Sequence, residues 1–230
     1  MLAAYWAMLK LVPVPGYGAG VLEPTGSLPW WIDSHLLAGH TWSGAPAPGF
    51  DPEGILSTLP AIASVLAGTL AGLWLRGPAA PAAKTRGLLL GGLALLAAGW
   101  LMGVWLPINK NLWTSSFTVF MAGWAMVLLA VFYWLIDVRG LRRWAQPFVL
   151  FGMNAIALFM LSGLLGRLLI FIQWAGPAGT KVSLKGWIYD TCFVPLASPV
   201  NASLLFAIAF VLVFLGVAWV MARRGWFLKA

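Results

Sequence analysis

The chain alternates between long apolar runs and short polar segments. Each long run contains about the 20 residues that an α-helix needs to cross a hydrocarbon core, whereas the strands of a membrane barrel would alternate in polarity over about 10 residues. The pattern therefore predicts an all-α, polytopic transmembrane helix bundle. We expect five full spans, at residues 54–76, 87–106, 114–136, 148–172 and 200–222.

The composition strengthens this prediction. Of the 230 residues, 61% are hydrophobic and 9% are charged, and the mean hydropathy is +0.90. A soluble domain has about 25% charged residues. The formal net charge of +8 comes from basic residues scattered between apolar runs rather than gathered on one soluble face, so nucleic acid is not an expected partner. The expected partner is the lipid bilayer, with residues 1–230 forming one membrane domain.

A shorter apolar segment opens the chain at residues 1–12. The run LAAYWAMLKLV would rise about 16 Å as a helix, roughly half of a bilayer. We expect it to be the outer half of a transmembrane helix, so that the chain is the C-terminal portion of a larger protein. An interfacial helix is the alternative.

The basic residues predict the topology. Nine of them fall on one side if the spans cross alternately, and this side is cytoplasmic by the positive-inside rule. They are Arg76, Lys84, Arg86, Arg139, Arg142, Arg143, Arg223, Arg224 and Lys229. Both termini are then expected to be cytoplasmic, while residues 13–53, 107–113 and 173–199 face outward. The short stretch 181–193 is expected to form an amphipathic surface element.

The outward loop 13–53 is rich in Pro and Gly, which favours turns, and its tryptophans indicate an ordered loop packed at the membrane interface. It ends in FDPEGILSTLP. Asp51 suits the N-cap of the following helix and Glu53 suits the positive end of the helix dipole, so capping alone is one interpretation. The other is that Asp51 or Glu53 lines an outward cavity as a base or substrate anchor.

The second polar segment is LPINKNLWTSSF, in which Asn109, Lys110 and Asn111 separate two apolar runs. Asn111 or Thr114 can cap the next helix. Capping does not require a lysine, and a basic residue outside runs against the charge bias. We therefore weigh a role for Lys110 in binding an anion or a carbonyl against simple snorkelling.

Three further groups are candidates. Asn154 lies inside a predicted span, where its amide must bond another helix or line a cavity. Arg139, Arg142 and Arg143 can anchor the membrane surface or hold a phosphate-bearing cofactor. His40 lies in the outward loop and can transfer protons near neutral pH. No metal site is expected, because the two histidines do not have the spacing of a zinc-binding helix.

The ordered series WIDSHLLAGHTW, FDPEGILSTLPAIASVLAGTLAG, LPINKNLWTSSF, WLIDVRG and FVLFGMNAIALF resembles the transmembrane acyltransferase family of heparan-alpha-glucosaminide N-acetyltransferase and its bacterial relatives. The likeness covers about residues 1–170 and is looser in the last span and its RRGWFLK tail. DPEG and NKNLW at this separation are fairly specific.

The resemblance implies a bacterial inner-membrane enzyme that takes acetyl from cytoplasmic acetyl-CoA and delivers it to the amine of an amino sugar across the membrane. Such a reaction needs a base for the amine proton and a donor for the developing oxyanion, which Lys110, Asn109 or Asn111 can provide. The family's catalytic histidine lies in an early motif that His40 does not match. We therefore expect the chain alone to be inactive and to pair with an N-terminal half or a second copy.

Two alternatives remain open from the sequence. Polar residues inside a bundle and an outward cavity also suit a permease for an amino sugar. The chain can also be a non-catalytic membrane subunit that assembles with a separately encoded partner.

Overall fold

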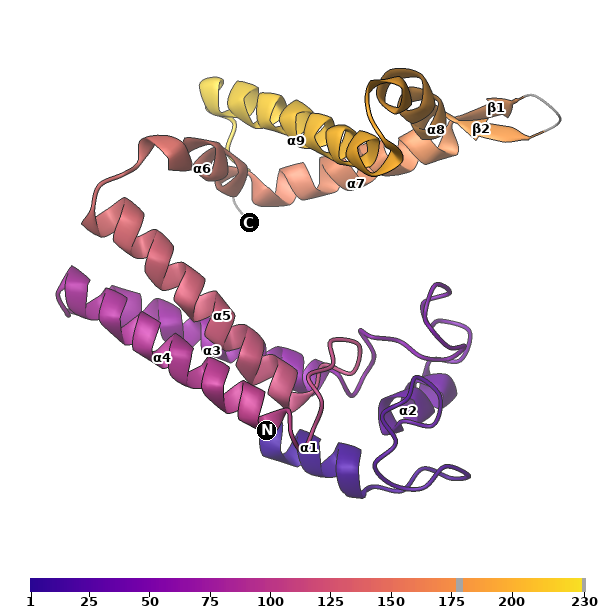
Figure 1. The fold of residues 1–230 in the computed structure, drawn as a ribbon, viewed down its shortest axis with the longest axis vertical. Coiled ribbons are helices and arrows are strands. Elements are labelled where there is room, and N and C mark those ends of the chain that lie inside the picture. Colours follow the sequence, from indigo (N-terminus) through magenta and orange to yellow (C-terminus); the bar gives the residue numbers. More distant parts are fainter. Residues whose placement is uncertain (177–179, 229–230) are drawn as a thin grey trace. The chain divides into compact units, whose positions relative to one another are not determined.

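The computed structural model describes residues 1–176 and 180–228, and the chain divides into two compact units, residues 1–140 and 141–230. Lys229, one of the nine basic residues that predicted the topology, lies outside the described residues. The first unit contains α1 (Leu2–Leu11), α2 (Leu28–Leu36), α3 (Thr58–Arg76), α4 (Pro81–Met102), α5 (Ser115–Tyr133) and the π-helical turn Trp134–Val138 (Figure 1).

Helices α4 and α5 pack along each other at very short range (Figure 1). A Cβ atom added at Gly99 would lie 2.7 Å from the Cα atom of Phe120, and one added at Gly123 would lie 2.6 Å from the backbone nitrogen of Leu96. These contacts are with backbone atoms, which cannot rotate away. Small residues that let backbones approach are the usual basis of helix packing in membranes, and here they hold the pair together.

The described residues contain four helices that are long and apolar enough to cross a membrane, and a fifth span if one bent pair counts as one. An all-α membrane bundle is therefore confirmed. The predicted run 54–76 begins as a helix only at Thr58, and the predicted run 87–106 is shifted to Pro81–Met102. Pro81 explains the second shift, because proline is well suited to the first turn of a helix.

The second unit begins with the 3₁₀ turn Arg143–Ala145, α6 (Gln146–Met153) and α7 (Ala155–Phe171). The sequence predicted one continuous span at 148–172, but the two helices meet at an angle of 74°. Asn154 lies at the break with non-helical dihedrals, φ −133° and ψ 34°. Its buried amide donates to the carbonyl of Trp226 (3.0 Å) and accepts from the N–H of Leu228 (2.9 Å), so the side chain bonds the chain beyond α9.

After α7 come a small antiparallel hairpin, short helical turns and the long helix α9 (Pro199–Arg223). The predicted amphipathic segment 181–193 divides into strand β2 (Lys181–Ser183), helix α8 (Leu184–Ile188) and the π-helical turn Tyr189–Phe193. Strand β1 (Gln173–Ala175) pairs with β2, and a 3₁₀ turn follows at Val194–Leu196. The core of this unit comprises Ala157, Leu158, Phe214, Ala218 and Met221.

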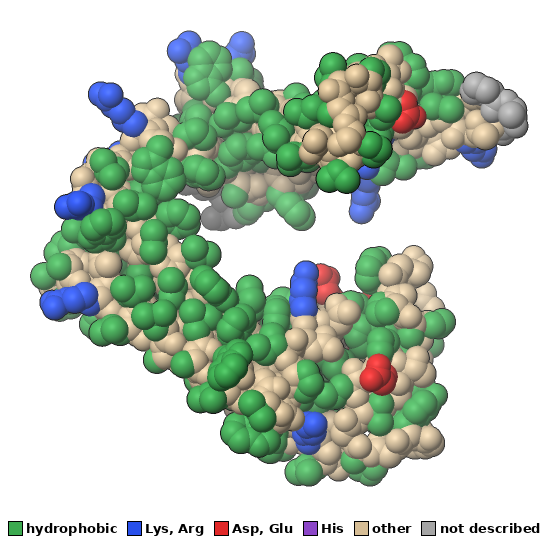
Figure 2. Space-filling view, viewed as in Figure 1, with side chains coloured by type: hydrophobic (Ala, Val, Ile, Leu, Met, Phe, Trp, Pro, Cys, Tyr) green, Lys and Arg blue, Asp and Glu red, His purple; other side chains and the backbone are tan. Residues whose placement is uncertain are grey.

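Hydrophobic side chains cover the long helices of the first unit on the face seen in Figure 2, and Lys and Arg side chains gather near the end where α3 leads into α4. Most large apolar residues of α3, such as Val65 and Leu70, are exposed in the isolated chain. Apolar flanks with charged ends are what a bilayer accommodates.

Candidate functional site

The segment between α1 and α3 is packed rather than loose. Ala47 and Phe50 are buried against Leu112, while Val14, Leu28 and Leu56 pack on Tyr5 and Leu9 of α1 in a second cluster. The Pro and Gly content favoured turns throughout, yet α2 forms within this segment, with Pro29 in its first turn. This core gives the two polar motifs a fixed support.

Asp51 holds a turn and does not cap a helix. The interpretation as the N-cap of the following helix is wrong, because α3 begins at Thr58 and its N-cap residue is Ser57. One carboxylate oxygen of Asp51 accepts from the N–H of Glu53 (2.9 Å), and the other accepts from the N–H of Trp42 (3.0 Å). Asp51 thereby connects the DPEG turn to a residue nine positions earlier.

The NKN segment is a second ordered turn. The side-chain oxygen of Asn109 accepts from the N–H groups of Asn111 (2.9 Å) and Leu112 (3.3 Å). The hydroxyl of Thr114, one of the two predicted caps, accepts from the N–H of Phe117 (3.4 Å) and donates to the carbonyl of Pro107 (2.8 Å). Thr114 is therefore the N-cap of α5, which leaves Lys110 and Asn111 without a part in capping.

The two turns face a common cavity of about 590 Å³, which we call the loop hollow. Figure 2 shows both acidic and basic side chains at this loop end of the unit. Four predicted site residues, Asp51, Glu53, Lys110 and Asn111, come together in its wall. The full lining is Trp42, Asp51, Pro52, Glu53, Lys110, Asn111 and Trp113. Asn109 holds the NKN turn through its hydrogen bonds and does not line the cavity.

Lys110 and Glu53 are the most available charges in this wall. Both side chains are exposed, and neither makes a hydrogen bond or an ion pair with any residue that the structure describes. Asp51, in contrast, uses both of its oxygens on backbone N–H groups. The loop hollow thus offers an ammonium and a carboxylate that a ligand can engage without breaking an internal bond.

Trp113 closes one side of the loop hollow in an unusual conformation. Among the described non-glycine residues it alone has a positive φ, 48°. Its indole N–H donates to the hydroxyl of Ser64 on α3 (3.3 Å), and its ring meets Phe117 edge-on with centroids 5.5 Å apart. A bulky residue in this region is strained, and such strain is common at functional sites. Nothing in the sequence signalled this backbone conformation.

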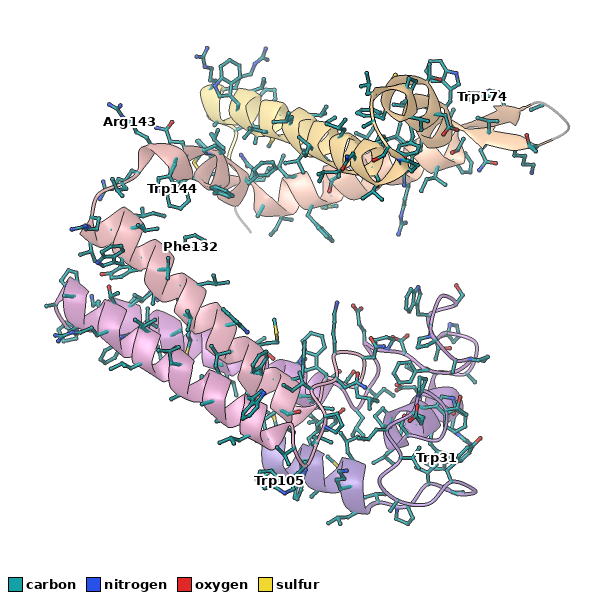
Figure 3. The ribbon with its side chains drawn as sticks, viewed as in Figure 1. Trp31, Trp105, Phe132, Arg143, Trp144 and Trp174 are labelled. Carbon is teal, nitrogen blue, oxygen red and sulfur yellow. The ribbon has the colours of Figure 1, made fainter. Side chains whose placement is uncertain are left out.

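The two histidines lie elsewhere. His40 is exposed and does not line the loop hollow; its backbone N–H donates to the carbonyl of Leu37. His35 stacks on Trp31 of α2 with ring centroids 4.6 Å apart, and Figure 3 shows Trp31 among the loop elements. Within residues 1–176 and 180–228, no group of three His, Cys, Asp or Glu side chains is arranged to hold a metal ion.

The residues predicted to hold a phosphate-bearing cofactor fall in both units. In the first unit, the guanidinium of Arg139 lies 4.9 Å from the ring centroid of Trp134. In the second unit, Arg142 and Arg143 are exposed, and Arg143 projects away from the start of α6 (Figure 3). Asn154 uses its amide on backbone groups of residues 226 and 228.

Sequence reasoning missed Asp33. This side chain of α2 is fully buried, and one carboxylate oxygen accepts from the N–H of Ile55 (3.0 Å), directly after the DPEG turn. The other oxygen has no hydrogen-bond partner among the described atoms. Burial raises the pKa of the Asp33 carboxyl, the Ile55 N–H lowers it, and the charge of Asp51 raises it; the net direction is upward. An aspartate within WIDSH gave no sequence signal of burial.

The raised pKa of Asp33 predicts a pH-dependent stability. The folded chain holds this proton more tightly than the unfolded chain, so the stabilisation is complete below the unfolded pKa of about 3.9 and is lost as pH rises through the folded pKa. We expect the melting temperature of the wild-type chain in detergent to fall relative to that of Asp33→Asn as pH rises above about 4. Parallel melting curves for the two proteins across this range would contradict the prediction.

Comparison with known proteins places these features in a family context. No family model matches the chain. The sequence is 30% identical to heparan-alpha-glucosaminide N-acetyltransferase of Homo sapiens in an alignment of 194 positions, gaps included, that covers 70% of the chain. The protein of the same name from Mus musculus is 28% identical in an alignment of 190 positions that covers 69% of the chain. The chain is a distant relative of these acetyltransferases.

This relationship confirms the resemblance that the ordered motifs indicated. The matched region makes up 28% of each acetyltransferase, so the chain spans less than a third of the length of the curated relatives. Together with the apolar helices, the relationship indicates a multi-pass membrane protein that is distantly related to acetyltransferases.

Proposed function

We propose that the chain forms the acceptor side of a membrane N-acetyltransferase, with the loop hollow binding an amino sugar whose amine receives acetyl from acetyl-CoA. The observation that carries this proposal is the joint presence of free Lys110 and Glu53 side chains in one cavity. The names of the two relatives supply the reaction class and the glucosaminide acceptor. An inner membrane of a bacterium is the proposed location.

The side chains of the loop hollow suit the binding of an amino sugar. An exposed carboxylate such as Glu53 attracts the ammonium form of the sugar and accepts its proton when the amine is released for attack. The indoles of Trp42 and Trp113 add apolar walls against which a sugar ring can pack. The remaining wall, from Asn111, offers both an amide donor and an acceptor for hydroxyl groups.

Lys110 is the proposed electrostatic partner of the acetyl group. During transfer the amine nitrogen bonds to the carbonyl carbon and negative charge develops on the carbonyl oxygen. The bond to sulfur then breaks, and the leaving thiolate takes the proton that the nitrogen loses, which releases the thiol of CoA. An ammonium close to that oxygen stabilises the developing charge. Asn109 and Asp51 serve this arrangement indirectly, because their side chains hold the two turns.

The donor brings several phosphates. In the second unit the exposed guanidinium groups of Arg142 and Arg143 carry the charge and the planar donors that bind phosphates, and Arg139 of the first unit is a separate candidate. Acetyl-CoA is a substrate here and supplies the acetyl thioester. The amide of Asn154 is engaged with backbone groups, so any contact with the donor would require it to exchange these bonds.

Binding of labelled glucosamine to the purified chain tests the acceptor site. We expect saturable binding that Glu53→Gln weakens by about tenfold, because one charge-assisted hydrogen bond is lost. N-acetylglucosamine, which lacks the ammonium, should bind the two proteins equally. Glu23→Gln is a matched control, because Glu23 is exposed and does not line the loop hollow. An absence of saturable binding by the wild-type chain would overturn the proposal.

A second assay separates transfer from transport. Vesicles containing the chain are supplied with labelled glucosamine, with or without internal acetyl-CoA. Acetamide that forms only with acetyl-CoA supports a transferase, whereas unchanged sugar that accumulates inside supports an amino-sugar permease. Binding without either reaction fits a subunit that needs a partner, and co-purification with an N-terminal half would identify that partner.

A further inference from the structure

Each of the two turns that form the loop hollow makes a hydrogen bond with a buried polar side chain outside the cavity. Asp33 of α2 accepts from the N–H of Ile55, directly after the DPEG turn. Tyr5 of α1 donates its hydroxyl proton to the carbonyl of Leu112, in the NKN turn. Both side chains are fully buried. Neither belongs to the lining of the loop hollow, so neither touches a ligand there.

The contact beneath the DPEG turn is tight as well as polar. Gly54 is buried directly over Asp33, and a Cβ atom added at Gly54 would overlap the carboxylate. Only a glycine lets the turn lie this close to α2. The carboxylate therefore fixes the distance between α2 and the turn that contains Asp51 and Glu53.

The contact beneath the NKN turn has the same form. The carbonyl of Leu112 that receives the Tyr5 hydroxyl lies two residues after Lys110 and one before Trp113. Leu112 itself is buried against Phe50, which immediately precedes Asp51. Loss of the hydroxyl would leave a buried carbonyl without this bond while the apolar packing remains.

We propose that Asp33 and Tyr5 are positioning residues that set the separation of the two charged walls of the loop hollow, and so the affinity for an amino sugar. This inference rests on the proposed function. A positioning role explains why a membrane protein with few charges buries the carboxylate of Asp33 against the DPEG turn, since burial of a carboxylate is by itself unfavourable.

The test measures glucosamine binding to the purified chain and its variants. Asp33→Ala, Gly54→Ala and Tyr5→Phe should each raise the dissociation constant by about tenfold, the effect of losing or displacing one buried hydrogen bond. Asp33→Asn should bind with the wild-type affinity, because the amide oxygen of the asparagine still accepts from the N–H of Ile55. Normal affinity in Asp33→Ala and Tyr5→Phe would overturn the inference.

Two controls separate positioning from general stability. Ser27→Ala removes a buried hydroxyl that has no partner among the described atoms, next to the same helix α2. Leu88→Ala creates a cavity on α4 in the cluster with Ala71 and Ala130, which contains neither Tyr5 nor a residue of either turn, so it lowers the melting temperature without touching them. Both should bind glucosamine normally. If affinity instead follows melting temperature across all variants, the two residues only stabilise the fold and the inference fails.

Hydrogen exchange provides a readout that does not need the sugar. Asp33→Ala should increase amide exchange in residues 51–57, and Tyr5→Phe should increase it in residues 109–114. If the wild-type chain does not bind glucosamine, the proposed function fails, and these local increases would still support positioning. Unchanged exchange in both segments would overturn it.

Discussion

Replacing Lys110 with alanine is expected to lower acetyl transfer about 10²–10³-fold, the usual effect of removing one donor to a developing oxyanion. The measurement is turnover of acetyl-CoA and glucosamine by an assembled transferase that contains this chain. Lys110 is exposed and has no internal bond among the described residues, so its removal should leave membrane insertion and melting temperature unchanged. The effect should appear in kcat more than in KM.

The comparison variants make this result specific. Lys110→Arg keeps the positive charge and should retain part of the activity, although the planar guanidinium does not reproduce the geometry of an ammonium. Lys181→Ala removes an exposed lysine from strand β2 and should have no effect. Near-normal turnover by Lys110→Ala would reduce the role of this lysine to snorkelling at the membrane surface.

Gly99→Val is expected to have the largest effect on stability. The new side chain would enter the backbone of α5 at Phe120, where an added Cβ atom would lie 2.7 Å from the Cα atom. Overpacking typically costs about 1–3 kcal/mol, and here the obstacle is backbone that no rotamer change relieves. We expect a lower melting temperature and a loss of monodisperse protein in detergent.

Gly68→Val makes the same exchange on α3, at an exposed position where an added Cβ atom meets nothing within 4 Å. This variant should behave like the wild-type chain. Equal yields and melting temperatures for Gly99→Val and Gly68→Val would show that close approach of α4 and α5 does not hold this unit together.

The positions of the long helices could be predicted because length and hydropathy determine whether a helix can cross a bilayer. The errors lie at the ends. Hydropathy includes Gly54 to Ser57 in a span. In the structure, Asp51 bonds the N–H of Glu53, Asp33 bonds the N–H of Ile55, and α3 begins only at Thr58. The break at Asn154 was equally hidden, because its cause is a pair of bonds to residues more than 70 positions away.

The candidate site was accessible from sequence only in part. Polar residues in an apolar chain are conspicuous, so DPEG and NKN stood out, and the structure brings four of their side chains to one cavity. Their catalytic and cofactor-binding roles stay predictions. Tertiary contacts decide which of these side chains are free and which are hydrogen-bonded. For this reason Asp33 was missed and Asp51 was interpreted as a cap.

The strained backbone at Trp113 has a consequence for engineering. A glycine would adopt a φ of 48° without steric penalty, whereas a tryptophan there stores about 1–3 kcal/mol. Yet glycine would remove the indole that bonds Ser64 and walls the loop hollow. The stability of a glycine variant is therefore the difference between the strain that it relieves and the packing of the indole that it loses. The loop hollow loses a wall whichever of the two is larger, so the melting temperature of a variant at position 113 does not report on its capacity to hold a ligand.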